Sequence, residues 1–359
     1  MDPDSVADVE RVPHGSSDDP DVLDLSANVN PRVPEGSREV YAAAFDDARS
    51  YPDDGYPVFR AAAADYVGCE ADAVVPTAGG LAAIRLAIGV TVSPGDPVLI
   101  PYPSFGEYAR EVRLAGGVPD LVPHDELLDC DPAGHAMAIV CTPNNPTGDL
   151  PGADELATFA DRCDSAGCVL LADEAFLGFT ERDSLARAGR DNVVVARSLT
   201  KLFGLPGLRA GFAVADGDLR ERLRTARPTW SLGGPAAAVG AHAMRDAAFV
   251  AETRDRVARE REHLRDGLEA RGFDVRPSEA PFLLCDAGGL REVGDGRTDG
   301  SIVEGTDGSV VDALLEGCRE RGVVLRDART FRGLDTHVRI AVRDRGSTDR
   351  QLAVLDEVL

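Results

Sequence analysis

Residues 197–209 read RSLTKLFGLPGLR and directly follow an apolar, β-branched run at 193–196. A strand that ends in polar residues and glycine places them at the mouth of a sheet crevice, where α/β proteins bind ligands. Lys201 is the only lysine among the 38 lysine and arginine residues of the chain. Arginine cannot lose its proton and condense with an aldehyde, whereas lysine can. The segment therefore predicts a reactive amine at position 201.

The flanking sequence predicts an α/β domain with a mainly parallel sheet, because short β-branched runs alternate with amphipathic stretches from about residue 71. We expect strands at 73–76, 97–100, 138–141, 169–172, 193–196 and 210–214. We expect helices at 80–90, 107–115, 154–166 and 218–226.

A second, smaller α+β domain is predicted after residue 235, where the sequence turns to long Arg/Glu-rich helical stretches. Its expected elements are a helix at 249–271 and strands near 273–276, 282–285, 323–325 and 338–342. We divide the chain into an N-terminal arm that joins the small domain, a large domain and a small C-terminal domain, at 1–35, 36–246 and 247–359. The acidic, glycine-rich interval 288–308 is expected to be a surface loop.

Composition excludes several classes of function. The 359 residues include 62 Asp and Glu against 38 Lys and Arg, for a net charge of −24, which repels nucleic acids and anionic membranes. Such an acidic surface is typical of a halophilic cytosol, where salt screens neighbouring carboxylates. Seven cysteines without a CxxC pair predict buried thiols rather than disulfides or a metal site. The first thirty residues lack a signal pattern, so we expect a cytoplasmic protein.

A phosphate site is predicted from three segments. Gly79 and Gly80 link an expected strand to an expected helix, so their backbone N–H groups and the helix dipole can bind a phosphate. Ser198 and Arg209, on either side of Lys201, can face the same dianion. The glycine pair by itself is a weak signal and more often an ordinary βα turn.

Two further polar residues follow expected strands. Asp173, in LADEAF, presents a carboxylate at the same sheet edge, as a protonated pyridine nitrogen requires. Asn145, in PNNPTG, could donate a hydrogen bond to a phenolic oxygen. Taken singly, Asp173 is also compatible with a helix cap and PNNPTG with a simple turn.

Together and in this order, the glycine turn, PNNPTG, ADEAF and SLTK with arginine eight residues beyond the lysine resemble the fold-type I pyridoxal-phosphate enzymes of the class I/II aminotransferase group. The resemblance extends from residue 23 to residue 359. It implies that Lys201 holds the cofactor covalently, Asp173 pairs with its ring nitrogen and Asn145 binds its phenolic oxygen. The phosphate would be bound by Gly79, Gly80, Ser198 and Arg209.

The same resemblance implies several more contacts. Phe105 would stack on the cofactor ring, Phe176 would border it, and Arg339 would clamp the substrate carboxylate in a bidentate manner. Tyr51 would reach the cofactor phosphate of a partner subunit, which implies a homodimer.

Local strings specify the expected reaction. LDLSANVNP at 23–31, HG at 14–15, DEAF at 173–176, PTWS at 228–231 and RDARTF at 326–331 resemble threonine-phosphate decarboxylases. That resemblance implies decarboxylation of L-threonine O-3-phosphate to (R)-1-aminopropan-2-ol O-phosphate for cobalamin, with His14, Asn30 and Arg326 at the substrate phosphate. The alternative is a histidinol-phosphate or related aminotransferase, in which tyrosine usually stands at the position of Phe176. A catalytically silent binding protein on the same fold is a third possibility.

Overall fold

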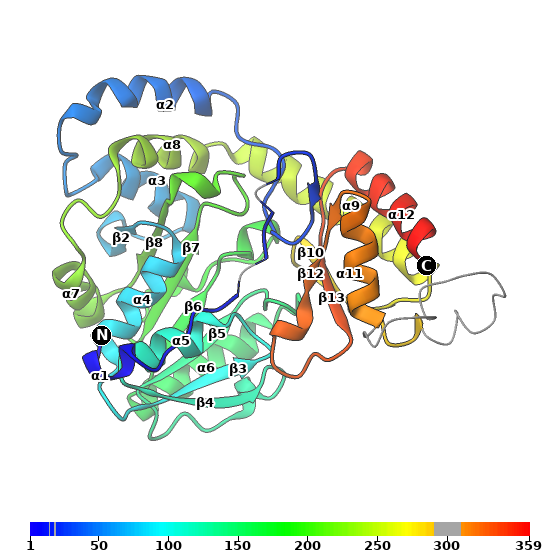
Figure 1. The fold of residues 1–359 in the computed structure, drawn as a ribbon. Helices are drawn as coiled ribbons and strands as arrows, with labels where there is room; N and C mark the ends of the chain where they lie inside the picture. The colour runs from blue at the N-terminus through cyan, green and yellow to red at the C-terminus, as the bar shows by residue number, and fades with distance from the viewer. Residues whose placement is uncertain (14, 18, 291–309) are drawn as a thin grey trace.

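A seven-stranded sheet forms the centre of the larger part of the molecule (Figure 1). The computed structural model describes residues 1–13, 15–17, 19–290 and 310–359. The strand order is β2-β8-β7-β6-β5-β3-β4, and only the two pairings of β8 are antiparallel. The strands are β2 (Val74–Thr77), β3 (Pro97–Tyr102), β4 (Val118–Pro123), β5 (Met137–Cys141), β6 (Val169–Asp173), β7 (Val193–Ser198) and β8 (Gly211–Val214). This mainly parallel sheet confirms the expected fold class.

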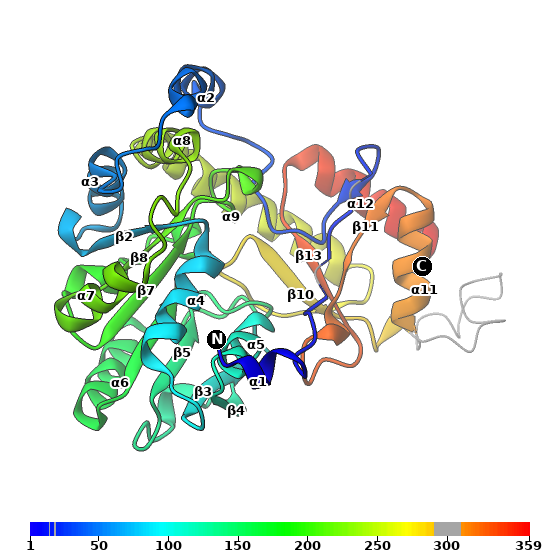
Figure 2. The same cartoon turned by 60° about the vertical axis from the view of Figure 1, so that its left-hand side comes forward.

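Helices cover both faces of the sheet, and the alternation of side chains along each strand explains why. In β7, Val193 and Val195 belong to one buried cluster, whereas Val194 and Ala196 belong to the other. The first cluster includes residues of α3 (Pro57–Val67), α6 (Ala153–Ala166) and α8 (Gly234–Met244). The second includes residues of α4 (Gly80–Thr91), α5 (Glu107–Leu114) and α7 (Gly217–Ala226). Helix α2 (Ser37–Asp46) packs on α8 at the periphery, and the short α1 (Pro3–Val6) contacts α5 (Figure 2).

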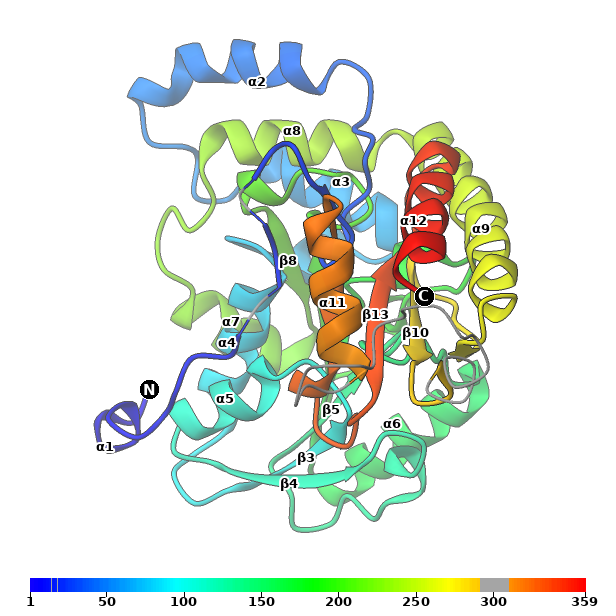
Figure 3. The same ribbon diagram turned by 45° about the vertical axis from the view of Figure 1, so that its right-hand side comes forward.

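The C-terminal third forms a smaller unit of strands and helices that packs next to the large sheet and its helices (Figure 3). Its antiparallel sheet has the order β12-β13-β10-β9, and β1 of the N-terminal arm pairs in parallel with β11. These strands are β1 (Leu23–Asp24), β9 (Asp274–Val275), β10 (Phe282–Asp286), β11 (Val323–Val324), β12 (Arg326–Asp327) and β13 (His337–Ala341). The accompanying helices are α9 (Ala247–Glu269), α11 (Val310–Glu320) and α12 (Arg345–Val358). The predicted boundaries after residues 35 and 246 stay a prediction, and most of the 288–308 interval lies outside the described residues.

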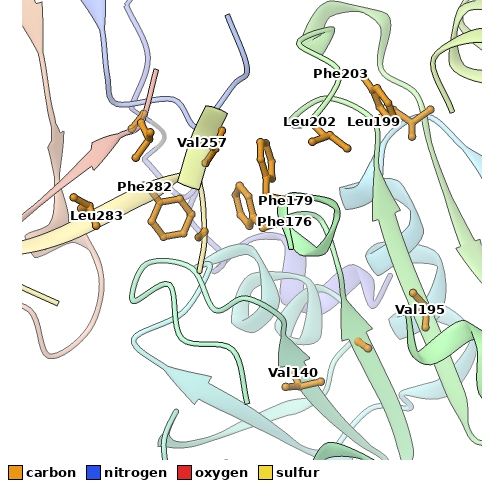
Figure 4. Close-up of a cluster of buried hydrophobic side chains, with 14 of the residues drawn as sticks. Val140, Phe176, Phe179, Val195, Leu199, Leu202, Phe203, Val257, Phe282 and Leu283 are labelled. Atoms are coloured by element: carbon orange, nitrogen blue, oxygen red, sulfur yellow. The ribbon is translucent and has the colours of Figure 1, made fainter. Parts of the chain in front are cut away.

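An aromatic cluster joins the two sheets. Phe176 and Phe179 follow β6 and lie beside Phe282 of β10 and Val257 of α9 (Figure 4). The rings of Phe176 and Phe282 meet edge to face, with centroids 5.1 Å apart. This contact holds the small sheet close to the carboxyl ends of the large one.

The structure also locates the cysteines. All seven are free, five of them buried, with Cys69 and Cys130 half-buried. Over the described ranges there is no group of three His, Cys, Asp or Glu side chains arranged to hold a metal. Within the same ranges, no helix has both the length and the apolar character needed to cross a bilayer.

Candidate active site

A cavity of about 390 Å³ lies where the carboxyl ends of β5, β6 and β7 face the small sheet and the N-terminal arm. The large sheet contributes Cys141, Asp173 and Ser198 from the ends of these three strands. Further charged and amide side chains come from the loop after β7, the PNNPTG turn, the arm and the small sheet: Lys201, Arg209, Asn145, Asn28, Arg326 and Arg339. Segments distant in sequence thus bring one amine, one carboxylate, two amides and three guanidinium groups to a single cavity.

Lys201 lies three residues beyond the end of β7, and its side chain lines the cavity. Burial lowers the pKa of its amine to about 8, and the positive charges of Arg339 and Arg209 act in the same direction. Asp173 opposes the shift. A large fraction of this amine is therefore neutral slightly above neutral pH, as nucleophilic attack on an aldehyde requires.

Asp173 ends β6 and is only 6% exposed. Its Oδ2 accepts a hydrogen bond of 2.6 Å from the Tyr108 hydroxyl, and its Oδ1 accepts one of 3.0 Å from the backbone N–H of Ala175. Burial raises the pKa of this carboxyl, whereas both hydrogen bonds lower it. The sequence did not predict a role for Tyr108, because this residue occupies a position on α5 with the helical spacing of an ordinary core residue.

The predicted phosphate residues meet at the N-terminus of α4. Gly79 has φ +97°, and a Cβ at this position would lie 2.6 Å from Nη2 of Arg209. A Cβ on Gly80 would lie 3.0 Å from that of Ser198. Ser198 Oγ is 2.8 Å from Oγ1 of Thr200, another cavity residue that sequence did not single out. A helix N-terminus, hydroxyls and a guanidinium at close range form a site for a phosphate dianion.

Arg339 and Arg326 line the cavity from strands β13 and β12 of the small sheet. Arg339 donates to the Ser26 carbonyl at 2.7 Å and to Oδ1 of Asn145, and its buried Nε has no partner among the described residues. Arg326 donates to the Pro13 carbonyl and to Oγ1 of Thr330, both at 2.9 Å. In the part of the chain that the structure describes, neither guanidinium is within ion-pair distance of a carboxylate. Burial lowers the pKa of Arg339 to about 9, so an anionic ligand would stabilise its charged form.

Asn145 and the aromatic residues complete the walls. Because Oδ1 of Asn145 accepts from Arg339, its amide nitrogen is the group left to donate to a ligand. Phe105 lines the cavity. Its ring meets that of Tyr108 edge to face at 5.6 Å. Phe176 lines the cavity as well and is 4% exposed.

Two of the predicted residues, Asn30 and Tyr51, do not line the cavity. The structure does not place Asn30 where a substrate phosphate could bind. Its Nδ2 donates to the Leu202 carbonyl at 2.7 Å, and its Oδ1 accepts from Arg256 at 2.7 Å, so both ends of the amide are bonded inside the protein. It braces the Lys201 loop instead of facing a substrate. Tyr51 is 77% exposed and stacks on Trp230, away from the cavity of its own subunit. His14 lies outside the described residues.

Asn28, two residues before Asn30, lines the cavity instead. It is 3% exposed, and its Oδ1 has no hydrogen-bond partner among the described residues. The LSANVNP string contains both asparagines, but only the path of the arm decides which side chain faces inward. An unpartnered buried oxygen is costly, so a ligand that donates to it is expected.

The donor set fits pyridoxal phosphate. The cavity offers a partly neutral amine for the aldehyde, a buried carboxylate for the ring nitrogen and an amide donor for the phenolic oxygen. The space beside Gly79 and Arg209, which any Cβ would fill, suits the phosphate.

Comparisons of the sequence agree with this fit. Residues 20–355 match the aminotransferase class I and II family. Histidinol-phosphate aminotransferase 2 of Archaeoglobus fulgidus is 31% identical over 349 residues, which cover 95% of this chain and 94% of that protein. Histidinol-phosphate aminotransferase of Halobacterium salinarum is 30% identical, with 98% and 94% covered.

Solved structures show the same fold. Histidinol-phosphate aminotransferase of Sinorhizobium meliloti, solved in complex with pyridoxal-5'-phosphate, superposes with a TM-score of 0.81 at 20% identity, covering 94% of this chain and 90% of that one. L-threonine-O-3-phosphate decarboxylase of Porphyromonas gingivalis gives 0.78 at 22% identity, with 94% and 99% covered. Enzymes with two different reactions therefore share this architecture.

Proposed function

The chain belongs to the aminotransferase class I and II family, whose cofactor is pyridoxal phosphate, and we propose that it transforms a small amino compound carrying a phosphate group. The observation that carries this proposal is the pair of buried guanidinium groups of Arg339 and Arg326 opposite Lys201. Neither has an acidic partner among the described residues, so both are available to bind anionic groups of a substrate. One suits a carboxylate and the other a phosphate.

The residues that line the cavity would have separate roles in the reaction. When bound, pyridoxal phosphate supplies an electron-withdrawing ring that stabilises negative charge on the substrate carbon next to nitrogen. Lys201 would hold the cofactor through its amine and would move a proton at that carbon. Asp173 would pair with the ring nitrogen, and Arg209, Ser198 and the N-terminus of α4 would hold the phosphate. Phe105 covers the ring and excludes water.

The reaction depends on which bond of the substrate carbon stands perpendicular to the ring, because only that bond exchanges electrons with it. Alignment of the bond to hydrogen leads to amino transfer, and alignment of the bond to a carboxylate leads to loss of CO₂. In threonine phosphate, Arg339 would hold the carboxylate and Arg326 the phosphate, and so select the alignment. Histidinol phosphate has only the phosphate, so Arg339 would then bind the carboxylate of the amino-acid co-substrate.

Amino transfer from histidinol phosphate or a related amine is the function that the comparisons favour. The relatives at 30–31% identity that cover nearly the whole chain carry this activity in their names. These relatives support the alternative considered from sequence over the decarboxylation that the local strings favoured.

Decarboxylation of threonine phosphate remains the second candidate, on a specific observation. Phe176 borders the cavity and is fixed against Phe282, so this wall lacks the hydroxyl that tyrosine supplies in histidinol-phosphate aminotransferases. The LSANVNP string, which carries the inward-facing Asn28, points the same way.

A paired assay tests both candidates. The cofactor-loaded protein is given histidinol phosphate with 2-oxoglutarate, and separately L-threonine O-phosphate with no oxo acid. Formation of glutamate in the first supports amino transfer, and release of CO₂ with aminopropanol phosphate in the second supports decarboxylation. Histidinol and threonine without phosphate serve as matched substrates. Equal turnover with and without the phosphate group would contradict the proposed substrate class.

We also propose that the protein acts as a homodimer. Its exposed large apolar side chains include a group on and around α2 and α3 and the 230 loop: Tyr41, Phe45, Tyr51, Val58 and Trp230. The stacked rings of Tyr51 and Trp230 lie 4.1 Å apart. Exposed aromatic residues gathered in this way are typical of a protein interface.

A further inference from the structure

We propose that Tyr108 is a positioning residue of the cofactor site, whose buried hydroxyl fixes the Asp173 carboxylate in one orientation and keeps it available to the cofactor's ring nitrogen. Tyr108 is fully buried, and its hydroxyl donates to Oδ2 of Asp173 at 2.6 Å. The Ala175 N–H holds Oδ1 at 3.0 Å. Each carboxylate oxygen is thus anchored by a different segment, α5 for one and the start of the loop after β6 for the other.

The hydroxyl also affects the charge of the carboxylate. Burial raises the pKa of Asp173, and the hydrogen bond from Tyr108 is the largest influence that lowers it, followed by the Ala175 N–H and the charges of Lys201 and Arg197. Cys141, at the end of β5, also lies beside this carboxylate, and burial raises the pKa of its thiol, so the thiol stays neutral. Burial beside Asp173 likewise raises the pKa of the Tyr108 phenol, which therefore remains a donor.

The consequence concerns cofactor binding. An ionised Asp173 stabilises a protonated pyridine nitrogen, whereas a neutral acid does not. Loss of the hydroxyl removes a charge-assisted hydrogen bond and makes Asp173 easier to protonate. Cofactor affinity should then fall, and it should fall at a higher pH than in the unaltered protein.

Tyr108→Phe tests this role and Tyr56→Phe is its control. Tyr56 is 4% exposed, and its hydroxyl donates to the Leu232 carbonyl at 2.7 Å, outside the cavity lining. Each change therefore removes one buried donor. Pyridoxal phosphate is titrated into the cofactor-free proteins between pH 5 and pH 9, following absorbance, and urea unfolding is measured in parallel. We expect about tenfold weaker binding in Tyr108→Phe, with the acid limb moved to higher pH, and unchanged binding in Tyr56→Phe.

A double-mutant cycle separates positioning from packing. In an Asp173→Asn background, Tyr108→Phe should weaken the cofactor no further, because the carboxylate on which the hydroxyl acts is gone. Tyr108→His restores a donor and should bind the cofactor more tightly than Tyr108→Phe. Equal affinity and equal acid limbs in Tyr108→Phe and the unaltered protein would overturn the proposal. So would a full additional loss in the Asp173→Asn background, or equal weakness of the Phe and His variants. None of these readouts depends on which substrate the enzyme uses.

Discussion

Lys201 is the residue at which a single change should have the largest effect. Lys201→Arg keeps the positive charge but removes the amine that can bond to an aldehyde, and Lys201→Ala removes both. We expect both variants to lose at least about 10²–10⁴-fold in turnover and to show no covalent cofactor after borohydride reduction. Intact-protein mass spectrometry makes the second measurement. The chain has no other lysine, so a Lys201→Arg variant with reduced cofactor attached anywhere except the N-terminal amine, as located by peptide mapping, would contradict the assignment.

The lowered pKa of Lys201 predicts how the cofactor-free protein captures pyridoxal phosphate. Burial, Arg339 and Arg209 bring the pKa of the amine to about 8. Only the neutral amine attacks an aldehyde, so the capture rate should rise with pH below about 8 and level off above it. Stopped-flow absorbance over pH 6 to 10 measures the profile. A rate that keeps rising to pH 10 would show an amine with an ordinary pKa.

Residues at strand ends were the ones that sequence could place. Lys201, Asp173 and Asn145 each stand at or shortly after the end of an apolar strand, and the carboxyl ends of parallel strands share one edge of a sheet. The role of Tyr108 was not predicted, because this residue lies within a helix and its hydrogen bond to Asp173 depends on how α5 packs. Only Asn30 was predicted from the arm, and Asn28 was not, because the arm has no regular period that shows which side chains face inward.

At the scale of elements, a buried ion pair joins the two strands that carry the site. Nη1 of Arg197 on β7 lies 2.9 Å from Oε2 of Glu174, the residue after β6, and both side chains are nearly inaccessible. Removing one partner leaves an uncompensated buried charge. Arg197→Met should therefore lower the free energy of unfolding by about 3–5 kcal/mol. Urea unfolding of the cofactor-free protein measures this loss.

The matched comparison uses an exposed pair. Asp183→Asn breaks the Arg187–Asp183 contact, in which both side chains are more than half exposed, and should cost less than about 1 kcal/mol. The double variant Arg197→Met with Glu174→Leu should regain most of the stability lost in Arg197→Met. Equal losses from the buried and exposed changes would show that the Arg197–Glu174 pair does not hold the strands together.

Elements were predictable where both faces of a strand are covered. Six strands of the large sheet are mostly apolar in sequence and were predicted. The edge strand β4 (Val118–Pro123) was not. Its prolines at 119 and 123 and its alternately exposed side chains resemble a loop. Proline is tolerated there because an edge strand leaves some backbone groups unpaired.

For the whole molecule, the net charge of −24 predicts stabilisation by salt. The Debye length falls from about 10 Å at 0.1 M salt to about 3 Å at 1 M, which weakens repulsion among the surface carboxylates. We expect the melting temperature to rise by roughly 5–10 °C between these concentrations of KCl. Calorimetry at fixed protein and cofactor concentration measures it. Potassium sulfate at equal ionic strength is the control, and a rise confined to sulfate would point to solute exclusion instead of screening.

The proposed dimer makes a prediction that no monomeric enzyme can satisfy. Tyr51 is 77% exposed and does not line the cavity of its own subunit, so we expect its contact with a cofactor phosphate to be made in a partner. Tyr51→Asp would place a carboxylate against that phosphate and Lys201→Ala removes the amine, so each variant alone should be inactive. Mixed and reassembled in equal amounts, half of the dimers are hybrids, and each hybrid contains one site with both residues intact. Activity should therefore return to about a quarter of the unaltered value. Sedimentation must first show that both variants form dimers, and a mixture of such dimers that stays inactive would place Tyr51 outside the shared site.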